Sequence, residues 1–191
     1  MKKQAITLGR VGILLPIAFF IPIIGQLAVL AGLVLVLISH YNFSKAFESP
    51  PIFNRALLGF IVSIFGQIIG AIIIGISVGL AAFSLAEGGV EPTNYQDAIS
   101  LIFGSGFAIF GLIVLLAGAI IGSFFLFQSL KELAEKSGIK LFRTAGLLYF
   151  IGAILAIILV GVLVMFVGWI IHIVAYFSIK PDPAEEAQQA V

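Results

Sequence analysis

The chain of 191 residues contains no cysteine, and only 10% of its residues are charged. The absence of cysteine excludes disulfides, iron–sulfur clusters and thiolate zinc sites. The two histidines, His40 and His172, are too few for a histidine-rich metal site. The net charge is +1, which provides no basic surface of the kind that nucleic acid requires. These shortages predict no metal, no cofactor and no nucleic-acid partner.

Apolar residues are abundant: they make up 61% of the chain, and the mean hydropathy is +1.24. A soluble domain is about 45–50% apolar and about 25% charged. Four runs contain no Asp, Glu, Lys or Arg, namely residues 11–44, 56–86, 98–130 and 144–179. Each run exceeds the roughly 20 residues of one transmembrane helix. Because the runs are continuous rather than alternating, they predict an all-α, polytopic transmembrane helical bundle without a sheet.

The first and fourth runs, of 34 and 36 residues, are long enough to hold two helices each. Pro22 and Gly25 predict a tight reversal in the first run, with a proline kink in one long helix as the alternative. In the fourth run the candidate breaks lie near Gly161 and Gly168. The second and third runs contain no proline, and each is predicted to form one long, tilted helix.

The positions of Lys and Arg distinguish these arrangements, because cytoplasmic loops of membrane proteins carry an excess of both. Four crossings place four of these residues on one side and six on the other. A hairpin in the first run makes the counts 9 and 1, and hairpins in both runs make them 10 and 0. The sequence therefore predicts six crossings in the cell membrane, with both termini cytoplasmic; five and four crossings are the alternatives. Short similarities that begin at Arg10, Arg55 and Arg143 favour three tandem helical hairpins.

Residues 1–180 are predicted to form a single transmembrane domain. The remaining residues, 181–191, have the sequence PDPAEEAQQAV, which is short, acidic and interrupted by proline. This composition predicts a disordered tail.

Several segments resemble an uncharacterised family of archaeal integral membrane proteins, itself a domain of unknown function. The similar segments are FIPIIG at 20–25, SGIKLFRTAGLL at 137–148, IGAIL at 151–155, WII at 169–171 and AYFSI at 175–179. The resemblance covers nearly the whole chain and implies an archaeal cell-membrane protein. It implies no activity and no functional residue.

Few polar residues lie within the four runs. The absence of charge there argues against proton relays and ion paths, which use intramembrane charges, and predicts no catalytic residue. Gln26 and Gln67 each follow a glycine and are interpreted as partners in interhelical hydrogen bonds, with a polar pore or ligand pocket as the alternative. His172 is a third candidate for either role, and no acidic residue lies near it in the sequence.

Two sets of glycines share a spacing of seven and then four residues, which places each set on one helix face. Small residues on one face let two helix backbones approach closely in a membrane. The second and third runs are therefore predicted to pack through these glycines. The two sets are Gly59, Gly66 and Gly70, and Gly111, Gly118 and Gly122.

Together these features predict a non-enzymatic membrane scaffold or interaction protein. Its expected partners are membrane lipids and either a second copy of the chain or an unknown membrane protein. The alternative is a small channel or transporter for a neutral or hydrophobic solute, supported by the broken helix near Pro22 and by Gln67. A membrane-embedded enzyme has the least support.

Overall fold

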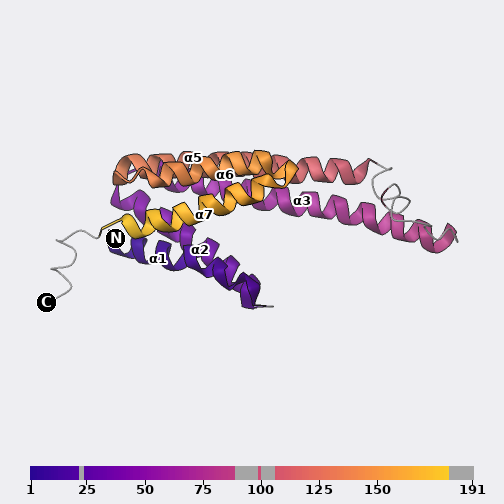
Figure 1. Cartoon of the computed structure of the whole chain (residues 1–191), viewed down its shortest axis with the longest axis horizontal. Helices are drawn as coiled ribbons and strands as arrows, with labels where there is room; N and C mark the ends of the chain where they lie inside the picture. Colours follow the sequence, from indigo (N-terminus) through magenta and orange to yellow (C-terminus); the bar gives the residue numbers. More distant parts are fainter. Residues whose placement is uncertain (22–23, 89–98, 100–105, 181–191) are drawn as a thin grey trace. The chain divides into compact units, whose positions relative to one another are not determined.

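The computed structural model describes residues 1–21, 24–88, 99 and 106–180. These residues are helical and include no strand, which confirms the all-α prediction (Figure 1). The helices are α1 (Lys2–Leu14), η1 (Leu15–Phe20), α2 (Ile24–Ala46), α3 (Pro50–Gly88), α5 (Phe107–Ser137), α6 (Leu141–Leu155), η2 (Ala156–Ile158) and α7 (Val160–Ser178).

Five helices in the described part of the chain are long and apolar enough to cross a membrane: α2, α3, α5, α6 continued by η2 (Leu141–Ile158), and α7. Helix α1 is not among them, because it has 13 residues and carries Lys2, Lys3 and Arg10. The fold is therefore that of a multi-pass helical membrane protein. The sixth crossing, which α1 and η1 would have to form, stays a prediction.

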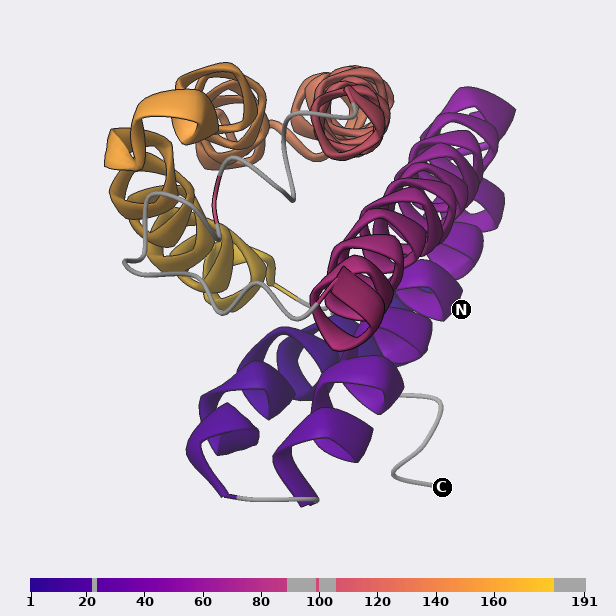
Figure 2. The same cartoon turned by 90° about the vertical axis from the view of Figure 1, so that its right-hand side faces the viewer.

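The first apolar run folds back on itself. Ser39 of α2 bonds to the carbonyl of Ala5, and Gly32 of α2 lies against the backbone of Gly12, so the two helices are antiparallel. Figure 2 shows α1 and α2 side by side. The alternative of one kinked helix is therefore wrong. The predicted turn residue Pro22 lies outside the described residues.

The fourth run also reverses, two residues before Gly161, which is one of the two residues near which a break was predicted. Leu159 adopts a left-handed backbone conformation (φ 62°) between η2 and α7. Gly161 and Gly168 lie within α7, where they serve packing instead. An added Cβ on Gly152 of α6 would lie 2.9 Å from the carbonyl oxygen of Gly161, and one on Gly168 would lie 3.1 Å from Cβ of Leu148. Glycine at these positions permits close approach of α6 and α7, and the turn falls on a leucine.

The second run forms one helix, as predicted, because α3 contains all of residues 56–86. The prediction of one helix over residues 98–130 is wrong at its beginning, since α5 starts at Phe107 after Gly106 with φ +74°. Helix α5 ends at Ser137. The next residue, Gly138, has φ +76°, which is the left-handed conformation that ends many helices.

Contacts divide the chain into two compact units. The first unit comprises Met1–Phe60 and Ser123–Val191, and the second comprises Ile61–Gly122. Helices α3 and α5 contribute residues to both. The single domain predicted over residues 1–180 stays a prediction, and the predicted tail at 181–191 lies outside the described residues.

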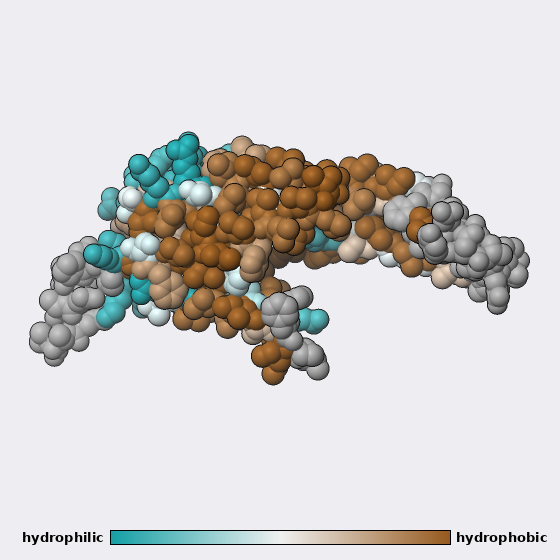
Figure 3. Space-filling model, viewed as in Figure 1, coloured by the Kyte–Doolittle hydropathy of each residue, from teal (hydrophilic) through white to brown (hydrophobic). Residues whose placement is uncertain are grey.

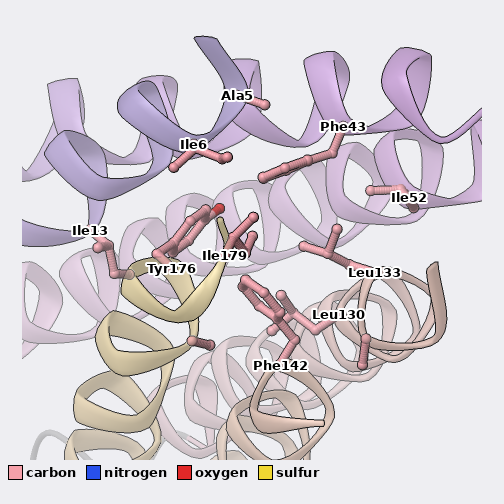
Figure 4. Packing of buried hydrophobic residues seen from close by; sticks show 12 residues of the cluster. Ala5, Ile6, Ile13, Phe43, Ile52, Leu130, Leu133, Phe142, Tyr176 and Ile179 are labelled. Atoms are coloured by element: carbon pink, nitrogen blue, oxygen red, sulfur yellow. The ribbon is translucent and has the colours of Figure 1, made fainter. Parts of the chain in front are cut away.

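In the first unit, hydrophilic residues gather at the end that holds the N-terminus, and the helix surfaces away from that end are hydrophobic (Figure 3). This distribution is expected of helices whose apolar sides face lipid. Figure 4 shows the buried core of the first unit; several of its residues, such as Phe43, Leu130 and Ile179, lie within two residues of a lysine in the sequence.

Candidate functional site

Tyr176 of α7 is the centre of the first unit's core and is completely buried (Figure 4). Its ring stacks on His172 with centroids 5.0 Å apart and meets Phe142 of α6 edge-on at 5.3 Å. Its hydroxyl lies 3.4 Å from Oγ of Ser39 in α2. Gly9 of α1 lies against the same ring, because an added Cβ there would overlap the ring atoms. One tyrosine thus joins four helices.

Both histidines are buried in the first unit. Nδ1 of His172 lies 3.4 Å from the hydroxyl of Tyr149 in α6, which links α6 to α7. Nδ1 of His40 lies 2.8 Å from the carbonyl oxygen of Val36, so this nitrogen is the donor. Among the described residues, neither Nε2 has a hydrogen-bond partner. Buried polar atoms are normally paired with protein or ordered water, so these two nitrogens are exceptions within the described core.

Arg10 of α1 reaches the C-terminal end of α7. Its guanidinium donates to the carbonyl oxygens of Tyr176, Phe177 and Ile179 at 3.2, 3.4 and 3.0 Å. The last carbonyls of a helix have no partner within the helix, and the helix dipole favours a cation there. Arg10 therefore completes the hydrogen bonding of α7 and fixes α1 against it.

The start of α3 and the end of α5 are joined by polar contacts within the first unit. Oγ of Ser129 donates to the carbonyl oxygen of Ile52 at 2.5 Å, and Oγ of Ser49 donates to Glu132 at 2.8 Å. Arg55 lies 4.0 Å from the other carboxylate oxygen of Glu132. An ion pair this exposed adds little to stability, so the two buried serines carry most of the attachment.

In the second unit, α3 and α5 touch backbone to backbone. An added Cβ on Gly66 would lie 2.6 Å from Cα of Gly118, and the reverse distance is the same. One turn away, Gly70 faces the carbonyl oxygen of Gly111 at 2.8 Å from its added Cβ. Gln67 donates to the carbonyl oxygen of Leu115 at 3.5 Å. We call this contact the glycine seam; it joins Gly66 and Gly70 to Gly118 and Gly111.

The other predicted residues lie elsewhere. Gly59 is buried in the first unit, and Gly122 is buried in the second. Gln26 is exposed near the start of α2 and belongs to the first unit, whereas Gln67 belongs to the second. A polar lining that contains both glutamines therefore stays a prediction.

A third glycine pair, Gly75 and Gly79 of α3, was not considered from the sequence, although its GxxxG spacing was visible there. Both glycines are exposed, and an added Cβ at either would meet nothing within 4 Å in the described part of the chain. Gly75 follows Gly70 by five residues, which places it on a different side of the helix from the seam. We call Gly75, Gly79 and their exposed neighbours Ile72, Ile76 and Phe83 the open glycine face.

The polar and small residues described above hold the helices against one another. Within the described part of the chain, no group of three or more His, Cys, Asp and Glu is placed to hold a metal ion. Trp169 illustrates the pattern, because its indole nitrogen donates to the carbonyl oxygen of Ile13 at 3.0 Å and links α7 to α1. Five apolar helices with polar groups used between helices define a multi-pass helical membrane protein.

The chain belongs to the family DUF996, described as a protein of unknown function, which matches residues 28–170. It is 33% identical over 184 residues to an uncharacterized protein, MJ1644, from Methanocaldococcus jannaschii, and the match covers 96% of each chain. No solved structure matches this chain. The resemblance to an archaeal membrane family of unknown function is thereby confirmed.

Proposed function

We propose that this protein is a non-enzymatic membrane scaffold that assembles with a second copy of itself through α3. One observation carries the proposal: α3 has two glycine faces, and α5 packs against only one of them. Gly66 and Gly70 meet the backbone of α5, whereas added Cβ atoms on Gly75 and Gly79 would meet none of the described residues within 4 Å.

A filled glycine face on the same helix indicates how the open face is used. In a membrane, apolar helices gain nothing from leaving lipid, so they associate through close packing of small residues. The contact of Gly66 with Gly118 is an example of such packing. The open glycine face is flanked by Ile72, Ile76 and Phe83, each more than half exposed, which supply the side chains around the contact.

A second copy is the occupant that this face favours. Two identical faces can meet about a twofold axis, where each glycine pair packs against its counterpart. The absence of charge from residues 56–86 leaves no ionic feature that would select a different partner.

The oligomeric state tests this proposal. The chain has a mass of 20.3 kDa, so the detergent-purified protein should have a protein mass of about twice that by light scattering. The double variant Gly75→Ile and Gly79→Ile should shift the protein to the monomer, because two large side chains hold the helices apart.

Cross-linking provides a matched control, since the chain contains no native cysteine. Ile76→Cys should form disulfide-linked dimers in membranes. Leu163→Cys in α7, which is 68% exposed, should not. A monomeric protein in lipid, or equal cross-linking at both positions, would refute self-assembly through α3.

The channel or transporter alternative receives no added support. Its polar residue in α3, Gln67, is used in the hydrogen bond to Leu115 of α5. That bond supports an interhelical role for Gln67 and favours the scaffold.

A further inference from the structure

A pocket of about 310 Å³ lies at the charged end of the first unit. Three lysines line it from different parts of the chain: Lys2 from α1, Lys136 from the end of α5 and Lys180 after α7. Its volume is at the lower end of the range of small-molecule sites, about 300–1,000 Å³. No acidic side chain is among the described residues that line it.

The lysines are not needed to complete the end of α7, because Arg10 already bonds its last carbonyls. Three ammonium groups around one cavity repel each other, and an anion placed among them removes that repulsion. The pocket is therefore suited to a negatively charged group.

The walls of the pocket are partly apolar. Phe47, Ile139 and Ile179 contribute to the lining, and Nζ of Lys2 lies 5.8 Å from the centroid of the Phe47 ring. The glycerol backbone of a lipid can pack against these apolar walls, whereas a small soluble anion gains no stabilising contact from them.

An apolar ridge on α7 continues from the pocket. Ser178 lines the pocket, and Val174, Ile170 and Val167 follow it at intervals of one helical turn toward the start of α7. These three side chains are 48%, 44% and 47% exposed, so the ridge is open to lipid. An acyl chain can lie along it while the headgroup occupies the pocket.

We propose that this pocket binds the phosphate group of an anionic membrane phospholipid, with its hydrocarbon chains along the Val174–Ile170–Val167 ridge. The site lies where apolar helices end, which is the depth of the headgroups in a bilayer. Basic residues at this depth attract anionic lipids. The inference is independent of self-assembly through α3, because all the residues involved belong to the first unit of one chain.

Lipid binding in a neutral detergent tests the proposal. The full chain is titrated with short-chain phosphatidylglycerol, and bound lipid is counted by native mass spectrometry. One lysine near the headgroups changes the affinity about fivefold, so the double variant Lys136→Gln and Lys180→Gln should bind roughly 25-fold more weakly. The control pair Lys131→Gln and Lys140→Gln removes the same charge from exposed positions outside the pocket and should change binding less than about twofold.

Two further measurements distinguish an anionic lipid from a neutral lipid and from a soluble anion. Phosphatidylcholine should bind at least tenfold more weakly than phosphatidylglycerol, and millimolar inorganic phosphate should not displace the lipid. Ile170→Ser should weaken lipid binding although it lies far from the lysines. Equal losses in both lysine pairs would show that binding is diffuse, and displacement by inorganic phosphate would show a soluble-anion site. Either result would overturn the proposal.

Discussion

Replacing Gly66 with alanine should loosen the contact of α3 with α5 in the second unit. The added Cβ would lie 2.6 Å from Cα of Gly118, about 0.8 Å inside the 3.4 Å at which ordinary contact begins. Both groups are fixed to helix backbones, so neither can rotate away and the helices must separate. The separation also weakens the contact of Gly70 with Gly111 one turn away.

The size of the effect follows from two opposing contributions. Overpacking of this kind destabilises a protein by about 1–3 kcal/mol. Alanine favours the helix over glycine by up to about 1 kcal/mol. Because the 2.6 Å contact is between groups fixed to the backbone, the overpacking lies in the upper part of its range, about 2–3 kcal/mol. The net loss should therefore be about 1–2 kcal/mol, which for a chain of this size corresponds to a Tm lower by about 2–8 °C. Gly118→Ala should have the same effect, because the contact is reciprocal.

Thermal unfolding of the detergent-purified protein measures this loss. Val78→Ile is the control, because it adds one methyl group at a position of α3 that is 44% exposed, and its Tm should equal that of the wild type. If Gly66→Ala and Gly118→Ala both leave Tm unchanged, the two helices do not touch at these glycines and the geometric reasoning fails.

Three other outcomes are expected. Gly9→Ala should lower Tm, because its Cβ would overlap the ring of Tyr176, and a wild-type Tm would contradict that packing. His172→Phe should lower Tm, because it removes the hydrogen bond of Nδ1 with the hydroxyl of Tyr149 and leaves that hydroxyl without this partner; an unchanged Tm would show that the bond does not contribute to stability. Single cysteines at the exposed positions of Gln4 and Glu48 should react alike with an impermeant reagent in intact cells, because α1 and α2 are antiparallel, and labelling of only one would refute the hairpin.

The sequence predicted the helices best where a single property, such as hydropathy or the absence of charge, extends over a whole run. Continuous apolar runs predicted membrane helices, because in lipid the backbone must satisfy its hydrogen bonds within the segment. The Lys and Arg count, with Pro22, predicted the first reversal. The second reversal was predicted only to lie near Gly161 or Gly168, and the turn residue Leu159 was not identified, because a left-handed leucine has no turn signature and Gly161 is a packing residue.

The contacts that join helices distant in the sequence, other than the glycine seam, were beyond sequence reasoning. Arg10 and the carbonyl of Tyr176 are 166 residues apart, and Lys2 shares a pocket with Lys136 and Lys180. No sequence motif marks either of these two associations. The open glycine face was visible as a spacing, but a spacing does not reveal whether another helix already fills it.

By itself, then, the sequence determined that the chain is a multi-pass helical membrane protein, because hydropathy and charge act on each run as a whole. Only the tertiary structure decided which side of each helix meets which neighbour. A helix that is apolar all round has no stripe to mark its buried side, and one residue of rotation turns a side chain by about 100°. The position of Tyr176, and the pairing of Gly66 with Gly118 and of Gly70 with Gly111 within the glycine seam, therefore depend on packing between helices that the linear pattern does not encode.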